Sequence, residues 1–192
     1  KEINKLNSKL FYFSSTQISS ISNNNLNNVS NHIHYNAGDN INDFNENKLL
    51  KNFEKLKFYD LQGSHWAPHI IHKDIWNRVG GFSKEFDPGF GSDPDLNMKL
   101  WKIGVRVFKG VNKSRIYHFG SLTTRKNKKI IRNNGGRTFL LKWGITINFF
   151  TKFYLLRGEK YSGSLKEPKI TISYLYNYIK CKIEYLYKIY GK

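Results

Sequence analysis

Two aspartates on either side of a proline are the residues of this sequence with the clearest capacity for chemistry. Asp93 and Asp95 form its only D-x-D, directly after the glycine-containing loop 86–92. One interpretation is a pair of metal ligands for a nucleotide diphosphate, although loop sequence rather than a buried strand precedes them. A second is a single catalytic carboxylate, Asp93, that accepts a proton late in a reaction. A third is a structural cap, because aspartate side chains often accept hydrogen bonds from the first N–H groups of a helix.

Three further side chains are candidates for a site. His118 follows Ile116 and Tyr117 at the expected end of a strand, where it is either a site residue or a structural one. His65 and Trp66 stand beside Gly63, and their rings would line a sugar pocket by stacking. The helices and strands on which these residues lie determine whether their side chains can meet in one site.

The stretch 63–124 predicts those elements in order. Residues 66–72 suit a strand that enters a short helix over 73–79, and Gly80 ends that helix as a glycine C-cap. Asp93 is predicted as the N-cap of the next helix, with Pro94 at the first helical position. That helix ends at Gly104. Strand-like sequence follows at 105–107 and 116–119.

The two flanks of this stretch are less informative. Residues 1–58 are weakly patterned: 11–13 suit a short strand, 14–40 a Ser/Asn-rich loop and 48–58 a helix. Beyond Arg125 the chain is basic and helical, and Gly135-Gly136 interrupts a helical pattern over 126–143. The last segment predicts an amphipathic helix that packs on its own protein, with docking on a membrane surface as the alternative. Its apolar face consists of Ile172, Leu175, Tyr176, Ile179, Ile183, Leu186 and Tyr190.

Composition limits the classes of protein that fit. The 192 residues carry a net charge of +18, which is typical of a protein with an anionic partner such as a nucleic acid, an anionic lipid, a nucleotide diphosphate or an acidic glycan. The alternative is that the heavy use of Lys, Asn and Ile reflects an AT-rich genome. A single cysteine, Cys181, excludes an internal disulfide and a cysteine zinc cluster. No apolar run approaches a membrane span and no signal peptide is visible, so we expect a reducing, cytoplasmic setting.

The motifs together resemble a known family. The segments 79–82 (VGGF), 86–87 (FD), 91–96 (GSDPDL), 101–104 (WKIG) and 116–118 (IYH) resemble, in order, the C-terminal half of the catalytic domain of family 2 glycosyltransferases. They are more distantly similar to the polypeptide N-acetylgalactosaminyltransferases. The resemblance implies an α/β fold of the GT-A (Rossmann-like) type, followed here by basic helices.

The resemblance also implies roles for the candidate residues. Asp93 falls on the position of the catalytic base, and His118 on that of a histidine that helps to bind a divalent metal, Mn²⁺ or Mg²⁺. Gly91, Ser92 and Asp95, together with His65 and Trp66, would contact substrate. The donor would be a nucleotide-sugar, most simply a UDP-sugar. The acceptor would be a glycan or a lipid-linked sugar in the synthesis of a surface or capsular polysaccharide.

Two departures shape the expected organisation. Ser92 stands where the family usually has glutamate, and the family's nucleotide-binding strands and metal-binding D-x-D are missing. We therefore expect a fragment that binds nucleotide-sugar weakly on its own. Its parts would be a weakly patterned segment 1–60, the C-terminal part of the catalytic core 61–125 and a basic helical region 126–192, with peripheral membrane contact through 170–192. The alternatives are a basic nucleic-acid-binding module, which we do not expect, and an inactive membrane-associated scaffold.

Overall fold

A five-stranded mixed sheet forms one side of the computed structural model, which describes residues 2–20, 32–63, 67–119 and 133–191. The strands are β1 (Phe11–Ser19), β2 (His32–His34), β3 (Leu61–Gln62), β4 (His69–Ile71) and β5 (Val107–Tyr117). Their order is β2-β1-β5-β3, and β4 also pairs with β1. The chain is thus mixed α/β.

Strand β1 is the centre of the sheet. It runs parallel to β5 along one edge, while its other edge is shared between β4 near its start and β2 at its end. The expectation of a short strand followed by a loop from residue 14 is therefore wrong. Ser14, Thr16 and Ser19 are buried polar residues inside this strand, so its sequence lacks the apolar alternation that would have indicated its full length.

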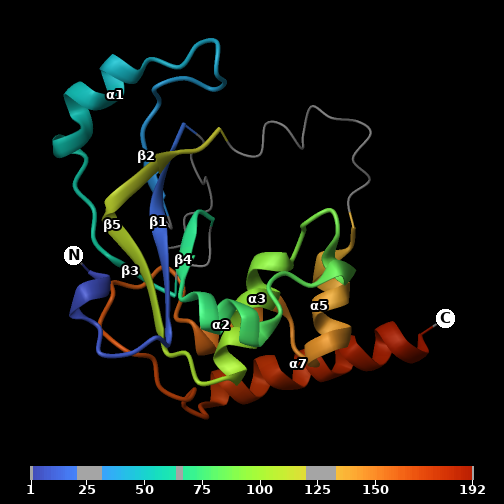
Figure 1. Cartoon of the computed structure of the whole chain (residues 1–192). Helices are drawn as coiled ribbons and strands as arrows, with labels where there is room; N and C mark the ends of the chain where they lie inside the picture. The colour runs from blue at the N-terminus through green and yellow to red at the C-terminus, as the bar shows by residue number, and fades with distance from the viewer. Residues whose placement is uncertain (1, 21–31, 64–66, 120–132, 192) are drawn as a thin grey trace.

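Helices cover the sheet and extend beyond it. The longer ones are α1 (Glu46–Asn52), α2 (Lys73–Val79), α3 (Ser92–Lys102), α5 (Gly135–Trp143) and α7 (Ile172–Tyr190), with a short α6 (Ile147–Phe149). Single turns are η1 (Ile3–Lys5), η2 (Phe53–Lys55) and η3 (Lys84–Phe86), and η4 (Phe150–Tyr154) is a π-helical turn. Figure 1 shows α2, α3 and α5 grouped beside the sheet, α7 running beneath them, and α1 at the opposite end.

Several predicted helices and strands are confirmed, and others have different bounds in the structure. The helix over 73–79 forms as predicted, and Gly80 ends it with a left-handed φ of 71°. The expected helix 48–58 is instead α1 followed by η2, and the two strand-like segments after residue 104 are one continuous strand, β5. Gly135 and Gly136 begin α5 rather than interrupt a helix, and residues 120–132 lie outside the described part of the chain.

Packing between the sheet and α3 forms the main core. Tyr12 of β1 and Phe108 of β5 pack with Leu96 and Leu100 of α3 and with Phe139 of α5, all at most 1% exposed. A smaller core joins the other end of the sheet to α1 through Ile18, Ile33, Ala37 and Leu49. Burial of these side chains fixes α3, and hence its acidic first turn, against the sheet.

Helix α7 attaches through a face that differs from the predicted one. Its Cys181 is 3% exposed, and Tyr174 and Tyr178 lie 5.0 and 5.9 Å, between ring centroids, from Phe149. The apolar face predicted to pack on the protein is exposed instead, with Ile183 at 63% exposure. The face with the tyrosines and the small cysteine packs against the rest of the protein. The face with the stronger hydrophobic pattern therefore does not make this contact.

Candidate active site

Asp93 lies in the first turn of α3, but it does not cap the helix. The cap position belongs to Gly91, whose φ of 88° is left-handed, and the helix begins at Ser92. The prediction of Asp93 as N-cap is therefore wrong by two positions. With Gly91 at the cap position, the Asp93 side chain is not needed to begin the helix.

The surroundings of Asp93 disfavour its charged form. Burial raises the pKa of Asp93 from an ordinary 3.8 to about 6. Part of the residue still reaches the surface, and no hydrogen bond or ion pair to its carboxylate is found within the described ranges. Tyr12 lies close by: burial raises the pKa of its hydroxyl, and the nearby Asp93 carboxylate raises it further. Asp93 is thus an acid poised near neutrality and open on one side.

Asp95 occupies the opposite kind of environment. Its side chain is completely buried, and it accepts hydrogen bonds from Ser83 Oγ at 2.6 Å and from Trp143 Nε1 at 2.8 Å. Lys142 Nζ adds an ion pair at 2.9 Å. These partners come from the loop between α2 and η3 and from α5, so Asp95 joins both segments to α3. Its oxygens are occupied by protein groups, which fits a structural role rather than substrate contact.

The loop before α3 is hydrogen-bonded to the residues that lead into α5. Asn133 donates from Nδ2 to the carbonyl oxygens of Phe86 and Phe90, at 2.9 and 3.0 Å. Ser92 Oγ donates to the carbonyl of Gly89 at 2.7 Å. A side chain at Gly135 would meet the Phe90 carbonyl oxygen at 1.8 Å, so only glycine allows this approach. Gly91 thus contributes its left-handed backbone conformation, and Ser92 contributes a hydrogen bond that holds the loop together.

An aromatic cluster linked to Asp93 through Tyr12 was not anticipated from the sequence. The ring of His69, on β4, lies 5.3 Å from that of Tyr12 and 5.9 Å from that of Phe82, and Trp76 meets Phe82 edge-on at 5.4 Å. Burial lowers the pKa of His69, which favours its neutral imidazole. Phe82 remains 44% exposed. A partly exposed group of rings is the kind of platform on which sugars stack.

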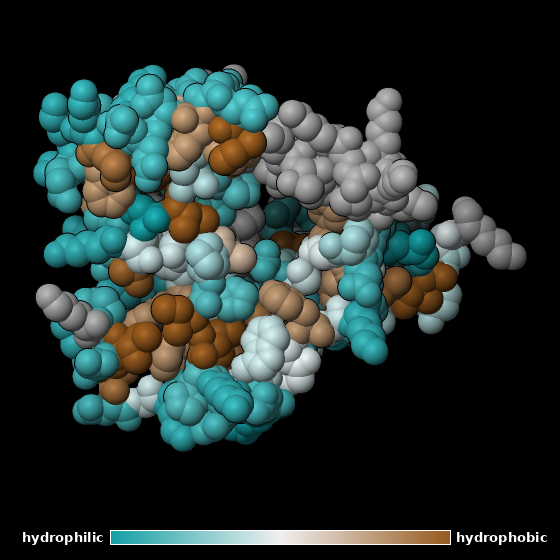
Figure 2. Space-filling view, turned by 45° about the horizontal axis from the view of Figure 1, so that its top comes forward, coloured by the Kyte–Doolittle hydropathy of each residue, from teal (hydrophilic) through white to brown (hydrophobic). Residues whose placement is uncertain are grey.

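The remaining candidates are only partly placed. His118 directly follows β5, as predicted, and its backbone N–H donates to the carbonyl of Ile18 at 2.8 Å. It therefore lies at the carboxyl end of the parallel strands, where ligands bind in open α/β sheets. His65 and Trp66 lie outside the described residues. Figure 2 looks onto this end of the molecule, whose surface is hollowed beside the atoms drawn in grey.

The described residues do not form a metal site by themselves. Among them no group of three or more histidine, cysteine, aspartate or glutamate side chains is placed to hold an ion. Asp93 and Asp95 do not offer a pair of metal ligands, because Asp95 is completely buried and its oxygens are bound by Ser83, Trp143 and Lys142. His118 then remains as the described candidate, and one imidazole does not retain a divalent ion.

In comparisons with known proteins, no family model, no curated protein and no solved structure matches this chain. The functional conclusion therefore depends on the geometry around Asp93 and on the resemblance of its motifs.

Proposed function

We propose that this chain is the acceptor-side part of a family 2 glycosyltransferase of the GT-A type. It would transfer a sugar from a nucleotide-diphosphate donor, most simply a UDP-sugar, to a hydroxyl of a glycan or lipid-linked acceptor in the synthesis of a surface polysaccharide. The observation that carries this proposal is the partly exposed Asp93 carboxyl, whose pKa of about 6 arises from burial at the start of α3.

Asp93 is the base in this reaction. The acceptor hydroxyl oxygen forms a bond to the anomeric carbon while the bond from that carbon to the diphosphate breaks, and the hydroxyl proton passes to Asp93. A carboxylate with a pKa near the working pH is mostly ionised before the reaction and accepts the proton readily during it. Because Asp95 ties the first turn of α3 to the loop before η3 and to α5, Asp93 is held on a rigid support.

The aromatic cluster supplies an acceptor platform. Phe82, Trp76 and His69 form a group of rings that Tyr12 connects to Asp93, and burial lowers the pKa of His69, which favours its uncharged form. Such a surface orients a sugar ring while leaving its hydroxyl free to approach Asp93.

A divalent ion, if it takes part, would offset the charge that builds on the leaving diphosphate. His118 is the described residue that would face it. Since the described residues fit such an ion poorly on their own, its other ligands would come from the diphosphate and from the D-x-D that the resemblance places upstream.

The test is an assay of transfer and hydrolysis over a panel of nucleotide-sugars with Mn²⁺ or Mg²⁺. It is run on residues 1–192 and on the same residues joined to any coding sequence that precedes them in the gene. Asp93→Asn should lower turnover by about 10²–10⁴-fold, while donor binding is retained. Asp87→Asn is the matched control, because Asp87 is exposed on the preceding loop, and it should leave turnover unchanged. Equal turnover in wild type and Asp93→Asn would overturn the assignment.

A nucleic-acid-binding module is the second candidate, and the net charge of +18 is the observation that favours it. Binding of labelled DNA or RNA with an affinity that falls steeply as salt is raised would support it. Binding that stays weak at about 0.15 M salt, alongside turnover of a nucleotide-sugar, would exclude it. A chain that is inactive with every donor and acceptor would favour the scaffold alternative instead.

A further inference from the structure

Helix α7 carries an apolar stripe that faces away from the rest of the protein. The stripe consists of Ile172, Leu175, Tyr176, Ile179, Ile183, Leu186, Tyr187 and Tyr190, all exposed, between 48% and 88%. Apart from the adjacent pairs 175–176 and 186–187, these positions recur at steps of three and four, so they share one face of the helix. Figure 2 shows hydrophobic residues at the surface of this end of the molecule, near the C-terminus.

The stripe is not needed to hold α7 in place. The opposite face, with Tyr174, Tyr178 and Cys181, makes the contacts with α6 and η4. Cys181 is buried, and its sulfur lies 3.5 Å from the backbone nitrogen and the hydroxyl of Thr146. Helix α7 is therefore docked on one side and bare on the other, and an exposed apolar stripe of this length indicates a surface that binds something.

Lysines border the stripe on both sides. Lys180 follows Ile179 and Lys182 precedes Ile183, so at about 100° per residue they lie on opposite edges of the stripe. Lys180 Nζ stands 4.4 Å from the ring centre of Tyr176, next to the apolar surface. Two more exposed lysines, Lys166 and Lys169, lie just before the helix. The occupant that this arrangement fits is apolar within and negatively charged at its surface.

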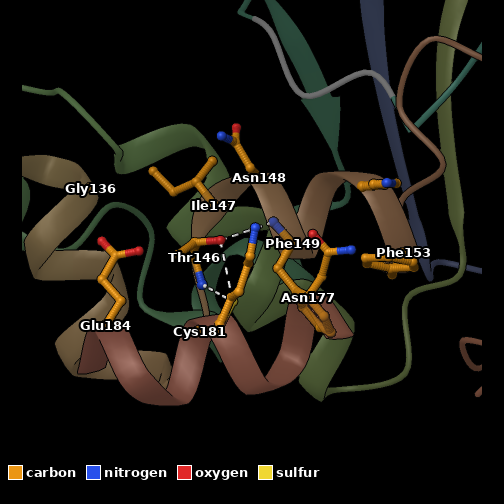
Figure 3. Close-up of a pocket in the computed structure, with 11 residues that line it drawn as sticks. Gly136, Thr146, Ile147, Asn148, Phe149, Phe153, Asn177, Cys181 and Glu184 are labelled. Atoms are coloured by element: carbon orange, nitrogen blue, oxygen red, sulfur yellow. Dashed lines mark hydrogen bonds between the residues drawn. The ribbon is translucent and has the colours of Figure 1, made fainter. Parts of the chain in front are cut away.

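A pocket of about 560 Å³ opens along one of these edges, between α7 and the segment of α6 and η4 (Figure 3). Asn148 and Lys152 line it from one side, and Asn177 and Lys180 line it from α7. Its lining thus places two ammonium groups and two amides beside the stripe. Glu184, the one acid of α7, also lines this pocket and so lies off the stripe.

We propose that α7 docks this protein on an anionic lipid bilayer, with the helix lying in the plane of the interface. The isoleucines and leucines of the stripe would enter the acyl region, the tyrosines would remain at its boundary, and Lys152 and Lys180 would face lipid phosphates. None of the helices in the described ranges is long and apolar enough to cross a membrane. The proposal does not depend on the transferase activity.

The charge around the stripe favours an anionic bilayer, rather than a second copy of this chain, as its binding partner. Pairing two stripes would bring the flanking lysines of one helix toward those of the other, on molecules that each carry a net charge of +18. An anionic bilayer instead neutralises these lysines while it covers the stripe. The same surface would also bring the protein close to a lipid-linked acceptor.

The test is cosedimentation of the full chain with vesicles of phosphatidylcholine alone or of equal parts phosphatidylcholine and phosphatidylglycerol. We expect binding to the anionic vesicles only. Ile179→Gln with Ile183→Gln should weaken it about tenfold or more, since two buried aliphatic side chains are lost from the acyl region. Ile41→Gln is the matched control, because Ile41 is 73% exposed far from α7, and it should bind as wild type. Circular dichroism of each variant establishes that it is folded.

A second measurement locates the helix in the bilayer. The emission of a solvent-sensitive fluorophore attached at Ile183→Cys should shift to the blue when anionic vesicles are added. The emission of one attached at Lys188→Cys, which is off the stripe, should not shift. Cys181 is buried, so it stays unlabelled during a brief reaction.

Three results would overturn the proposal. One is equal vesicle binding by wild type and the double variant, which would assign binding to net charge alone. Another is no binding at all. The third is a wild-type dimer that the double variant converts to monomer, which would make a second copy the occupant.

Discussion

Asp93 and Asp95 are two residues apart in the first turn of α3, yet their carboxylates lie in opposite environments. Asp95 is completely buried and is held by Ser83, Trp143 and Lys142. Asp93 is partly exposed, and burial without a compensating cation raises its pKa to about 6. One acid therefore anchors the helix and the other is available for chemistry, and this division suggests how each will respond to substitution.

The pH dependence of stability should reveal Asp93. Its pKa is higher in the folded than in the unfolded chain, so the folded state holds the extra proton and stability falls as the pH rises between about 4 and 6. Asp93→Asn should remove this loss. We expect the variant to be more stable than wild type by on the order of 1–3 kcal/mol near pH 7, and nearly equal to it near pH 4. Urea unfolding at both pH values measures this, and a variant less stable than wild type near pH 7 would contradict the raised pKa.

Substitution of Asp95 should have the opposite effect on stability. Asp95→Asn leaves Lys142 without its buried partner, so we expect a loss of about 3–5 kcal/mol in the free energy of unfolding. Glu85→Gln is the control, because Glu85 pairs with the same lysine at 2.7 Å but is exposed, and its loss should be below about 1 kcal/mol. Equal losses in the two variants would show that burial of Asp95 is not what makes the pair important.

The two glycines at the start of α5 should differ sharply. Alanine normally stabilises a helix relative to glycine by about 1 kcal/mol, and Gly136→Ala should show this, because the nearest atom to a new Cβ lies at 4.0 Å. Gly135→Ala should destabilise the protein instead, since its Cβ would collide with the Phe90 carbonyl. Thermal unfolding compares the two. A Gly135→Ala variant as stable as Gly136→Ala would mean that the loop before α3 can move away freely.

Metal binding by residues 1–192 alone should be weak. The described residues offer His118 without a cluster of further ligands, so calorimetric titration with Mn²⁺ should show no saturable binding in the micromolar range. Wild type and His118→Ala should then give the same titration. Tight binding that His118→Ala abolishes would show that the remaining ligands lie in the segments outside the described ranges.

Local sequence chemistry predicted part of this structure well. Helix α2 and its glycine cap were predicted to the residue, because the cap depends on a backbone conformation that glycine adopts readily. The start of α3 was misplaced because Asp93 and Pro94 look like a cap and a first turn, while Gly91 takes the cap position without a side-chain hydrogen bond. The GT-A assignment and the roles of the site residues stay predictions.

Long-range packing determines the features of the fold that could not be predicted from the sequence. Strand β1 is buried among three neighbouring strands, so its serines and threonine are inside and the usual alternation is absent. The exposed face of α7 is more hydrophobic than the docked one, which misled the prediction of how it packs. The ties from Asn133 and Gly135 to the loop before α3 join residues more than forty positions apart, and periodicity carries no information on such contacts.

The pairing of β1 with β5 has a consequence for how the chain folds during synthesis. Phe11 pairs with Val107 and Ile18 with Tyr117, so the central strand cannot acquire its longest partner until residue 117 has left the ribosome. Contacts this distant in sequence slow folding, because a long loop must close before they form. Until then one edge of β1 is unpaired and its Phe-Tyr-Phe start is apolar, so this strand is the part of the nascent chain where a chaperone would be needed most.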